Sequence, residues 1–407
     1  MRVLFVTGEF PPMQGGVGDY SALLARALRE QGAEVSVLTS ARASKKQMTA
    51  EDARWTLPIM RNWGTNCWRT ILQAASERKA DIVHVQYQTA AFGMNPAINL
   101  LPWAARLRGR HRPRVFVTFH DLKPPYLFPK AGPVRRLPAA VLATGADGVV
   151  VTNEEDATAL AKTPGITTSA AAKSGRRRVH LIPIGSNIPV VPVKQEDIQD
   201  WRVELGIEPS ALLLSFFGFL NQNKGIDLLL EALAALSQRG LPINLLMIGG
   251  AAGDSDTSSR AYAHKIRAIT DSPGLRRCVY WTGFTRPEEV SRNLSRTDVC
   301  VLPFREGGSY RHGTLVAALV HGLPIVTTPT APAVASEFTD GFPRLRHLEN
   351  CFLIPAGDVR PLAGAIEQLA GDSQLRQRLS QGSRELAPYF QWNRIAQSTL
   401  TMYEQIE

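Results

Sequence analysis

Three glycine-containing segments hold the residue types and spacing that phosphate binding requires. The first follows an apolar run at the start of the chain and contains Gly15 and Gly16 ahead of a helical pattern. Glycines at that place let backbone N–H groups approach a phosphate closely. The stretch from Gly16 to Ser21 begins like a dinucleotide-binding fingerprint, but serine replaces its last glycine, which disfavours a nicotinamide cofactor. We expect a phosphate-binding loop here, with an ordinary turn as the alternative.

The second segment combines Gly218, at the end of an apolar run, with Lys224 and Gly225 at the start of an amphipathic helix. A lysine at that position lies beside the positive end of the helix dipole, where a cation is unfavourable unless an anion shares the site. The pattern therefore favours a phosphate ligand at Lys224.

The third segment follows the apolar run at residues 298–302 and leads into a helix. It joins glycines and hydroxyl groups to two arginines, and such a combination at a helix N-terminus predicts an anion-binding site. Its candidate residues are Arg305, Glu306, Gly307, Gly308, Ser309, Arg311 and Thr314.

Two series of short apolar runs, alternating with helical patterns, must position these segments. We expect the first six strands at Arg2–Thr7, Glu34–Thr39, Asp81–Gln86, Arg114–Phe119, Asp147–Thr152 and Val179–Pro183. We expect the second six at Ala211–Phe217, Ile243–Ile248, Cys278–Thr282, Asp298–Pro303, Pro324–Thr328 and Cys351–Ile354. Near-continuous apolar runs are typical of strands buried on both faces, and alternation with helices implies parallel sheets. Ligands bind outside the carboxyl ends of such strands, which is where all three segments lie.

Further stretches set the expected boundaries between elements. We expect a helix from Tyr20 to Gln31, because its leucines fall on one face and Gly32 follows. Residues 163–178 and 249–260 are rich in small and polar residues and predict exposed loops. The proline-containing stretch 183–193 marks the junction between the two series.

The composition is that of an ordinary folded protein. Of the 407 residues, 44% are hydrophobic and 20% are charged, which excludes an intrinsically disordered chain. No apolar stretch is long enough to span a membrane and the start does not resemble a secretory signal, so we expect a cytoplasmic protein. The four cysteines lie far apart and the histidines show no metal-ligand spacing, so we expect neither a disulfide framework nor a metal site.

The net charge of +10 is concentrated in one part of the chain. Residues 101–180 contain 14 lysines and arginines against 5 acidic residues. Such a field suits an anionic ligand or a peripheral contact with the inner face of a membrane, and a solvated surface is the alternative. Nucleic acid is not expected, because no aromatic residues interleave with the arginines.

Motifs in a fixed order along nearly the whole chain resemble those of the family 4 retaining glycosyltransferases. They are the glycine pair at 15–16, Asp81-Ile-Val-His-Val-Gln86, Thr118-Phe-His-Asp121, Ile182-Pro-Ile-Gly185, Gly218 with Lys224-Gly225, Gly322-Leu-Pro324 and the tail at 389–396. The resemblance implies the GT-B architecture, in which two Rossmann-like doubly wound α/β domains face each other across a cleft and a C-terminal helix crosses back. It implies an acceptor-binding domain at 1–188, a nucleotide-sugar-binding domain at 189–385 and the returning helix at 386–407.

By this resemblance the protein moves a hexose-type sugar from a UDP- or GDP-linked donor to a hydroxyl of a glycan, a lipid-linked molecule or a small molecule. No acidic metal cluster is apparent in the sequence, so we expect Lys224 and an arginine to replace a divalent ion, with no cofactor beyond the nucleotide sugar as co-substrate. The expected catalytic residues are His120, Lys224 and Glu306. The expected donor-binding residues are Gly15, Gly16, Gly218, Lys224, Arg305, Gly307, Gly308, Ser309, Arg311 and Thr314, and the acceptor-binding residues are Tyr87, Asp121 and Tyr126.

Two positions depart from the family pattern. Phe219 stands where the family usually has arginine. The family's Glu-x7-Glu pair is also broken. One register puts Thr314 at the second glutamate, and the other puts Ser309 and Ala317 at the pair. Either register loses the carboxylate that usually holds the nucleotide ribose.

These departures motivate one hypothesis and keep two alternatives open. The hypothesis is that Arg311 or Arg305 supplies the missing positive charge on the diphosphate. The first alternative is a degenerate GT-B protein that acts as a non-catalytic binding or partner subunit. The second is a sugar-nucleotide epimerase of the same architecture, which would need carboxylates for its chemistry.

Overall fold

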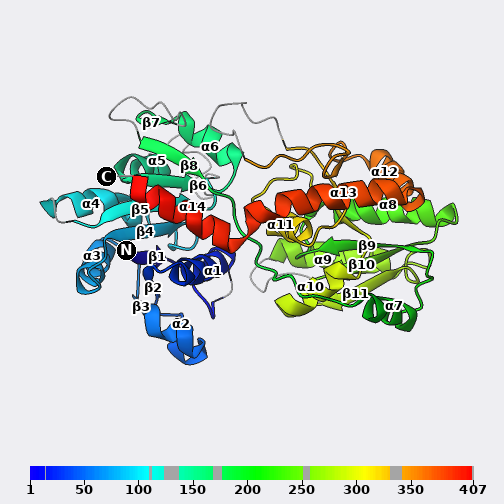
Figure 1. Cartoon of the computed structure of the whole chain (residues 1–407), viewed down its shortest axis with the longest axis horizontal. Helices are drawn as coiled ribbons and strands as arrows, with labels where there is room; N and C mark the ends of the chain where they lie inside the picture. The colour runs from blue at the N-terminus through cyan, green and yellow to red at the C-terminus, as the bar shows by residue number, and fades with distance from the viewer. Residues whose placement is uncertain are drawn as a thin grey trace. The chain divides into compact units, whose positions relative to one another are not determined.

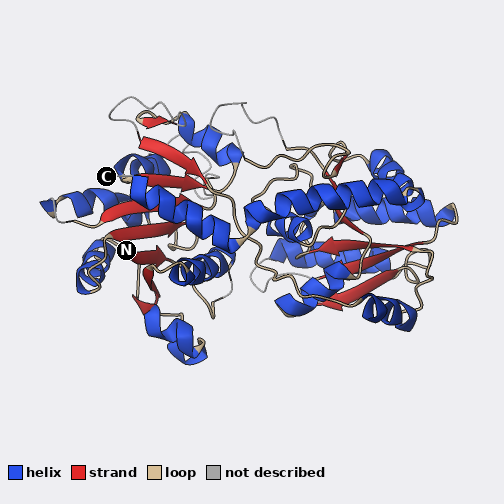
Figure 2. Ribbon diagram, viewed as in Figure 1, coloured by secondary structure: helices blue, strands red, loops and turns tan. Residues whose placement is uncertain are grey.

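The computed structural model of the chain describes residues 1–13, 15–109, 112–122, 137–167, 177–250, 257–330 and 342–405. It forms two compact units (Figure 1). The N-terminal unit comprises Met1–Gly185, Ala333–Phe342 and Trp392–Glu407, and the C-terminal unit comprises Ser186–Pro332 and Pro343–Gln391. Strands and helices alternate in both units (Figure 2).

The N-terminal unit is built on an eight-stranded sheet in which every pair of neighbouring strands is parallel. In spatial order its strands are β3 (Thr56–Met60), β2 (Glu34–Ser40), β1 (Arg2–Thr7), β4 (Ile82–Tyr87), β5 (Arg114–Phe119), β6 (Gly148–Val151), β8 (Arg177–Leu181) and β7 (Ile166–Thr167). Its α-helices are α1 (Gly16–Glu30), α2 (Ala50–Trp55), α3 (Cys67–Glu77), α4 (Leu101–Arg106), α5 (Leu137–Gly145), α6 (Glu154–Ala161) and α14 (Trp392–Gln405).

Alternating side chains of these strands pack into two apolar cores, one on each face of the sheet. Leu4 and Val6 of β1 lie in a core with residues of α3, α4 and α5. Val3 and Phe5 lie in a second core with residues of α1 and α14. The sheet is therefore covered by helices on both faces, as the near-continuous apolar runs predicted.

The C-terminal helix α14 packs on the N-terminal unit, where Figure 1 shows it in red. Its Tyr403 is fully buried, and the hydroxyl lies 2.5 Å from Nδ1 of His84 in β4. Arg114 donates to the carbonyl oxygen of Tyr403 at 3.0 Å. The returning helix implied by the family resemblance is thus anchored on the first sheet.

The C-terminal unit is built on a six-stranded parallel sheet. In spatial order its strands are β11 (Val279–Gly283), β10 (Ile243–Ile248), β9 (Leu212–Phe217), β12 (Val299–Leu302), β13 (Ile325–Thr327) and β14 (Phe352–Leu353). Its α-helices are α7 (Gln195–Glu204), α8 (Ile226–Gln238), α9 (Thr257–Thr270), α10 (Pro287–Ser295), α11 (Gly313–Val320), α12 (Val359–Gly371) and α13 (Ser373–Leu386). Helix α8 packs beside α12, and α11 packs beside α13 (Figure 1).

The predicted fold class is correct, and all twelve predicted strands are present within a few residues of their expected bounds. Several local predictions are wrong. Strand β3 was not expected, because Pro58 interrupts its apolar run and marks an edge strand. Strand β7 and the start of helix α9 lie inside the two predicted loops. The polar and small residues there do not show the apolar pattern of a strand or helix. Helix α1 begins at Gly16 rather than Tyr20, so the first glycine segment is shorter than expected.

An aspartate at the amino end of a strand holds the neighbouring strand in register at three places. In each case the carboxylate accepts a hydrogen bond from the backbone N–H of the first or second residue of that neighbour. The pairs are Asp81 with Arg2 at 2.7 Å, Asp147 with Val115 at 2.8 Å and Asp298 with Leu213 at 2.8 Å. This contact satisfies a backbone donor that would otherwise have no partner at the sheet end.

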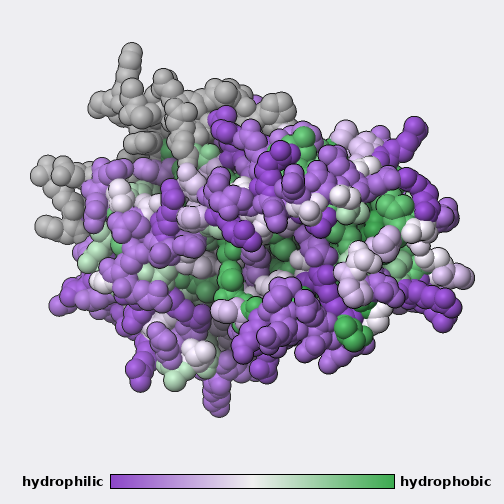
Figure 3. All heavy atoms as spheres, turned by 45° about the vertical axis from the view of Figure 1, so that its right-hand side comes forward, coloured by the Kyte–Doolittle hydropathy of each residue, from purple (hydrophilic) through white to green (hydrophobic). Residues whose placement is uncertain are grey.

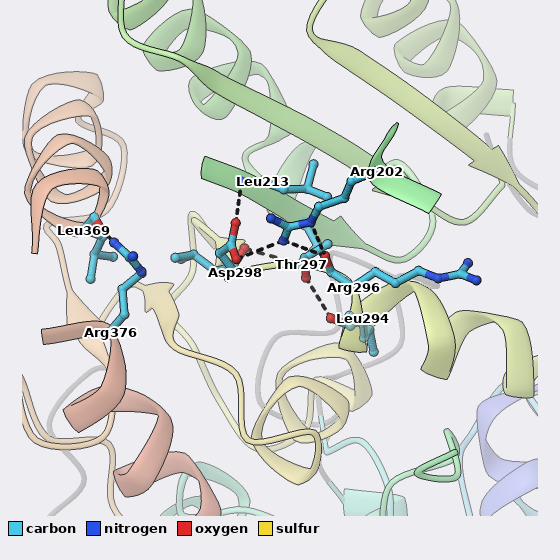
Figure 4. A network of polar contacts seen from close by, with 10 residues as sticks. Arg202, Leu213, Leu294, Arg296, Thr297, Asp298, Leu369 and Arg376 are labelled. Atoms are coloured by element: carbon cyan, nitrogen blue, oxygen red, sulfur yellow. Dashed lines mark hydrogen bonds and ion pairs between the residues drawn. The ribbon is translucent and has the colours of Figure 1, made fainter. Parts of the chain in front are cut away.

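The contact at Asp298 belongs to a larger polar network (Figure 4). Arg202 of α7 forms an ion pair with Asp298 at 2.9 Å and donates to the carbonyl oxygen of Arg296 at 2.8 Å. The Thr297 hydroxyl donates to the carbonyl oxygen of Leu294 and lies 2.9 Å from the hydroxyl of Ser215. The amino end of this sheet is therefore closed by groups that satisfy one another.

The face drawn in Figure 3 is mostly hydrophilic, with small separate apolar patches. Among the residues that the structure describes, no helix combines the length and apolar character needed to cross a membrane.

Candidate functional site

The carboxyl end of β9 brings two distant residues together around Gly218. A Cβ atom at Gly218 would lie 2.2 Å from Nζ of Lys224 and 2.9 Å from Cγ2 of Thr314. The backbone of Gly218 also has a φ of 121°, in the region that favours glycine. Glycine is required here because the lysine and the threonine both approach the main chain closely.

Lys224 is a half-buried cation at the start of α8. Within the described part of the chain its Nζ has no hydrogen-bond or ion-pair partner, and burial lowers the pKa of the ammonium group to about 8. The group therefore stays mostly protonated at neutral pH. A buried cation without a counterion is costly, so this position is suited to an anionic ligand.

The segment that carries Lys224 is fixed by short local contacts. Asn221 caps the turn Gln222–Lys224 by accepting from the backbone N–H of Asn223 at 2.8 Å. Gly225, with a φ of 67°, begins helix α8, and a Cβ atom there would lie 2.2 Å from the carbonyl oxygen of Pro303. The lysine is thereby held against the end of β12.

Arg305, in the third glycine-containing segment, contacts the second segment, which carries Lys224. Its guanidinium forms an ion pair with Asp227 at 2.7 Å, and its backbone N–H donates to the carbonyl oxygen of Asn223 at 2.8 Å. Tyr262 donates to the other oxygen of Asp227 at 2.9 Å. The charge of Arg305 is thus balanced within the protein, and the residue holds the lysine segment to the loop after β12.

The glycines of the third segment pack against the end of β13. A Cβ atom at Gly307 would lie 2.7 Å from the carbonyl oxygen of Pro329, and one at Gly308 would lie 2.6 Å from Oγ1 of Thr327. Both glycines are buried. Close backbone packing therefore accounts for these two positions, and their contact with a donor remains a prediction.

The remaining residues of the third segment differ in exposure. Glu306 is exposed and accepts from the side-chain amide of Asn223 at 3.2 Å. Ser309 is buried, and Arg311 is half-buried. His312, at the N-cap of α11, stacks on Phe304 with a ring-centroid distance of 4.1 Å.

Thr314 lies in the first turn of α11, beside Lys224. Its Oγ1 is buried and has no hydrogen-bond partner among the residues described. A helix N-terminus attracts anions through its free N–H groups and its dipole. The hydroxyl, the ammonium group and the helix end together form a site suited to a phosphate.

In the N-terminal unit, His120 follows β5 and lies among neutral groups. Its Nε2 is 3.0 Å from Oε1 of Gln86, and its ring packs edge-on to Tyr20 at 4.6 Å. Burial lowers the pKa of His120 to about 3, so the ring is neutral at pH 7. If Nε2 donates to the Gln86 oxygen, Nδ1 carries the free lone pair and can accept a hydrogen bond.

The first glycine segment forms the start of helix α1. Gly15 is its N-cap and Gly16 its first residue, where a Cβ atom would meet open space. A Cβ atom at Gly15 would lie 2.0 Å from Oε2 of Glu9, so a carboxyl group lies against this helix end. Burial raises the pKa of Glu9, and sequence reasoning had not singled this residue out.

The three residues expected to bind an acceptor have different environments. Tyr87 is buried in the core, with its ring stacked on Phe92 at 5.9 Å, so packing explains it. Asp121 is half-buried directly after His120. Tyr126 lies outside the described residues.

The fold and these sites define the class of protein. Two consecutive parallel sheets, each flanked by helices and with candidate ligand residues at the carboxyl ends of the strands, are the GT-B architecture. Residues 15–185 match the family described as "Glycosyl transferase 4-like domain", and residues 211–372 match "Glycosyl transferases group 1". The chain belongs to the glycosyltransferases of the GT-B type.

Curated relatives are similar at low identity. The chain is 25% identical over 234 residues to D-inositol 3-phosphate glycosyltransferase from Jonesia denitrificans, which covers 56% of this chain and 51% of that protein. It is also 25% identical to the putative glycosyltransferase EpsD from Bacillus subtilis, over 92% of this chain and 90% of that one. The chain thus spans about half the length of the first relative and nearly all of the second.

A solved structure shows the same fold over the whole chain. HepE from Anabaena, in complex with UDP, superposes with a TM-score of 0.73 at 18% identity, covering 99% of this chain and all of that one.

Proposed function

We propose that the protein transfers a hexose-type sugar from a nucleoside-diphosphate donor to an acceptor hydroxyl, with retention of the anomeric configuration and without a metal ion. The observation that carries this proposal is the half-buried cation of Lys224 at the carboxyl end of β9, which has no partner among the residues that the structure describes. A nucleotide sugar offers the diphosphate that such a group requires. The C-terminal unit is accordingly the donor-binding unit.

The residues around Gly218 are suited to stabilise the departing diphosphate. Lys224 would place its positive charge on the phosphates, and the Thr314 hydroxyl would donate a hydrogen bond to them. Fixed charges and dipoles aimed at developing negative charge are usually the largest contribution to catalysis of this kind. The protein cation then does what a divalent ion does in other transferases, which is the reason to expect metal independence.

The transfer step itself needs no dedicated protein base. The bond between the anomeric carbon and the diphosphate oxygen breaks while the acceptor oxygen bonds to the same face of that carbon. The acceptor proton passes to the departing phosphate oxygen. Retention follows, because the entering and leaving oxygens share one face.

His120 is the candidate for orienting a hydroxyl group near the reacting carbon. A neutral ring with a free lone pair accepts a hydrogen bond, whereas a protonated ring would repel the developing positive charge of the sugar. The low pKa of His120, about 3, keeps it in the accepting form throughout the physiological range.

UDP is the first nucleotide to test, since UDP is bound in the HepE structure, and GDP is the second. For the acceptor, the basic stretch 101–180 favours an anionic molecule, either a soluble phosphate ester or a lipid-linked one at the inner face of a membrane. A cytoplasmic location would suit either.

Ligand-induced thermal stabilisation tests the donor site. A nucleoside diphosphate at 100 times its dissociation constant should stabilise the fold by about 2.7 kcal/mol. We expect UDP or GDP to raise the melting temperature of the wild type and of Lys265→Ala, an exposed-lysine control on α9, but not of Lys224→Ala. Equal stabilisation of all three proteins would remove Lys224 from the site, and stabilisation of none would overturn the donor proposal.

Turnover distinguishes transfer from the two alternatives. Release of nucleoside diphosphate with a sugar product of unchanged anomeric configuration, unaffected by EDTA, is the expected result. Donor binding without turnover across an acceptor panel would indicate a non-catalytic subunit, in line with the missing glutamate pair. An isomerised nucleotide sugar formed without acceptor would indicate an epimerase.

A further inference from the structure

Gln86 is a fully buried residue at the carboxyl end of β4, and its side-chain amide contacts His120. Its Oε1 lies 3.0 Å from Nε2 of His120, which follows β5. Because side chains alternate between the two faces of a sheet, Gln86 shares a face with His84, whose ring contacts Tyr403 of α14. Gln86 and His120 therefore meet on the face of the sheet that α14 covers.

Only one half of the Gln86 amide has a partner. Among the residues that the structure describes, its buried amide nitrogen has no hydrogen-bond partner. A buried donor without a partner costs stability, and an apolar side chain of similar size would avoid that cost. The stability of the fold therefore does not explain a glutamine at this position, whereas the contact with His120 does.

Tyr20 of α1 packs against the ring of His120 from a second side. Tyr20 is buried, its ring is edge-on to His120 with centroids 4.6 Å apart, and Trp392 of α14 packs on Tyr20 at 5.3 Å. Rotation of the His120 ring by half a turn would move Nε2 away from the oxygen of Gln86. The amide and the aromatic ring thus favour one orientation, in which Nε2 carries the proton and Nδ1 the lone pair.

A neutral partner suits the role proposed for His120. A carboxylate at the place of the amide would stabilise the protonated ring, since opposite charges attract, whereas an amide orients the ring without favouring a positive charge. We infer that Gln86 is a positioning residue that keeps His120 neutral and leaves Nδ1 free to accept a hydrogen bond from a substrate hydroxyl. This inference rests on the proposed function and deepens it.

The surroundings of His120 make its charge a sensitive measure of the group at position 86. His84 of β4 and Tyr20 of α1 are both neutral at pH 7, because burial lowers the pKa of His84 to about 3 and raises the pKa of the Tyr20 hydroxyl. Asp121 follows His120 directly and is half-buried. Asp121 is present in every variant below, so it does not affect their comparison.

NMR of protein labelled at the histidine nitrogens tests the inference without substrate. The proteins are the wild type, Gln86→Met, Gln86→Glu and the control Thr118→Val, which removes a buried contact with His84 beside Gln86. His120→Asn assigns the signals. In the wild type and the control we expect a neutral His120 at pH 7, with its Nε2 proton protected from exchange. Gln86→Met should lose this protection, and Gln86→Glu should raise the pKa of His120 above its ordinary value of about 6.5.

Turnover gives an independent measure, with the donor and acceptor that the wild type selects from the panel. Gln86→Met should lower kcat about ten-fold and leave KM for the donor within two-fold, because the orientation of His120 acts on the reacting sugar. With saturating donor, kcat of Gln86→Glu should increase as pH rises through the raised pKa of His120. The control should keep the wild-type kcat. The free energy of unfolding of Gln86→Met should stay near the wild-type value, since the unpartnered amide nitrogen is lost with the hydrogen bond.

Each contrary result has a distinct meaning. A proton on Nδ1 of His120 in the wild type would overturn the inference, because the amide would then present its nitrogen to the ring. A neutral His120 in Gln86→Glu at pH 7, or a wild-type kcat in both Gln86 variants, would overturn it as well. Equal losses in Thr118→Val would overturn it by assigning the effect to the whole sheet face. Absence of turnover in the wild type would contradict the proposed function, while NMR would still decide whether Gln86 orients His120.

Discussion

The two ends of the sheet in the C-terminal unit differ in whether their buried polar groups have hydrogen-bond or ion-pair partners. At the amino end, Asp298 is engaged by both Arg202 and the backbone of Leu213, and the nearby hydroxyls pair with one another (Figure 4). At the carboxyl end, the ammonium group of Lys224 and the hydroxyl of Thr314 have no partner within the described residues. Polar groups that have hydrogen-bond or ion-pair partners stabilise the fold, whereas buried polar groups without partners are suited to bind a ligand. We therefore expect the amino end to stabilise the fold and the carboxyl end to bind a ligand.

The contrast predicts that substitutions at the two ends separate binding from stability. Lys224→Ala should have the largest effect, lowering affinity for a nucleoside diphosphate about 100-fold, since truncating one partner of a desolvated charge pair costs about 2.7 kcal/mol. The free energy of unfolding without ligand should not fall, because an uncompensated buried charge is removed. Calorimetric titration and chemical denaturation measure the two quantities. A marked loss of stability would show that Lys224 serves the fold.

Asp298→Ala should give the reverse result. It leaves Arg202 without its ion-pair partner and the N–H of Leu213 without its acceptor, which we expect to cost about 2 kcal/mol of stability. Thermal and urea denaturation would detect this loss. At a temperature where the variant is folded, its affinity for the nucleoside diphosphate should match that of the wild type. A variant of normal stability would mean that the network at the amino end contributes nothing.

The pH dependence of binding should show the titration of Lys224. The pKa of about 8 in the unliganded protein means that the cation is lost as pH rises through that value, so affinity should fall about ten-fold between pH 7 and pH 9. In Lys224→Arg the guanidinium stays charged over this range, so any affinity that remains should be nearly independent of pH. The same slope in both proteins would assign the titration to another group.

Thr314→Val should have the smallest effect. The change keeps the shape of the side chain and removes a buried hydroxyl that has no hydrogen-bond partner in the described part of the chain. We expect about a five-fold loss of affinity for the nucleoside diphosphate, because one hydrogen bond contributes about 1 kcal/mol. The melting temperature without ligand should be unchanged or slightly higher. A clear drop would show that the hydroxyl already has a structural role.

The N-terminal unit shows how far local patterns reach and where they stop. Its central strands were predictable because each is a short apolar run. The edge strand β3 was not predicted, because Pro58 interrupts its apolar run. Tyr87 was a candidate for stacking on an acceptor, but its ring is buried against Phe92, which comes from the loop after the same strand. The position of the Glu9 carboxyl group against Gly15 could not be predicted, because it depends on the conformation of the loop between β1 and α1.

The sequence by itself determined the two parallel sheets and singled out Lys224 as a candidate phosphate ligand. Apolar runs set the strands through burial, and a lysine ahead of a helix conflicts with the helix dipole wherever the helix lies. Only the tertiary structure decided that Arg305 pairs with Asp227, 78 residues away, and that Phe219 stacks on Phe284. Whether a charge or a ring is available to a ligand depends on what distant segments place beside it, and spacing along the chain does not carry that information.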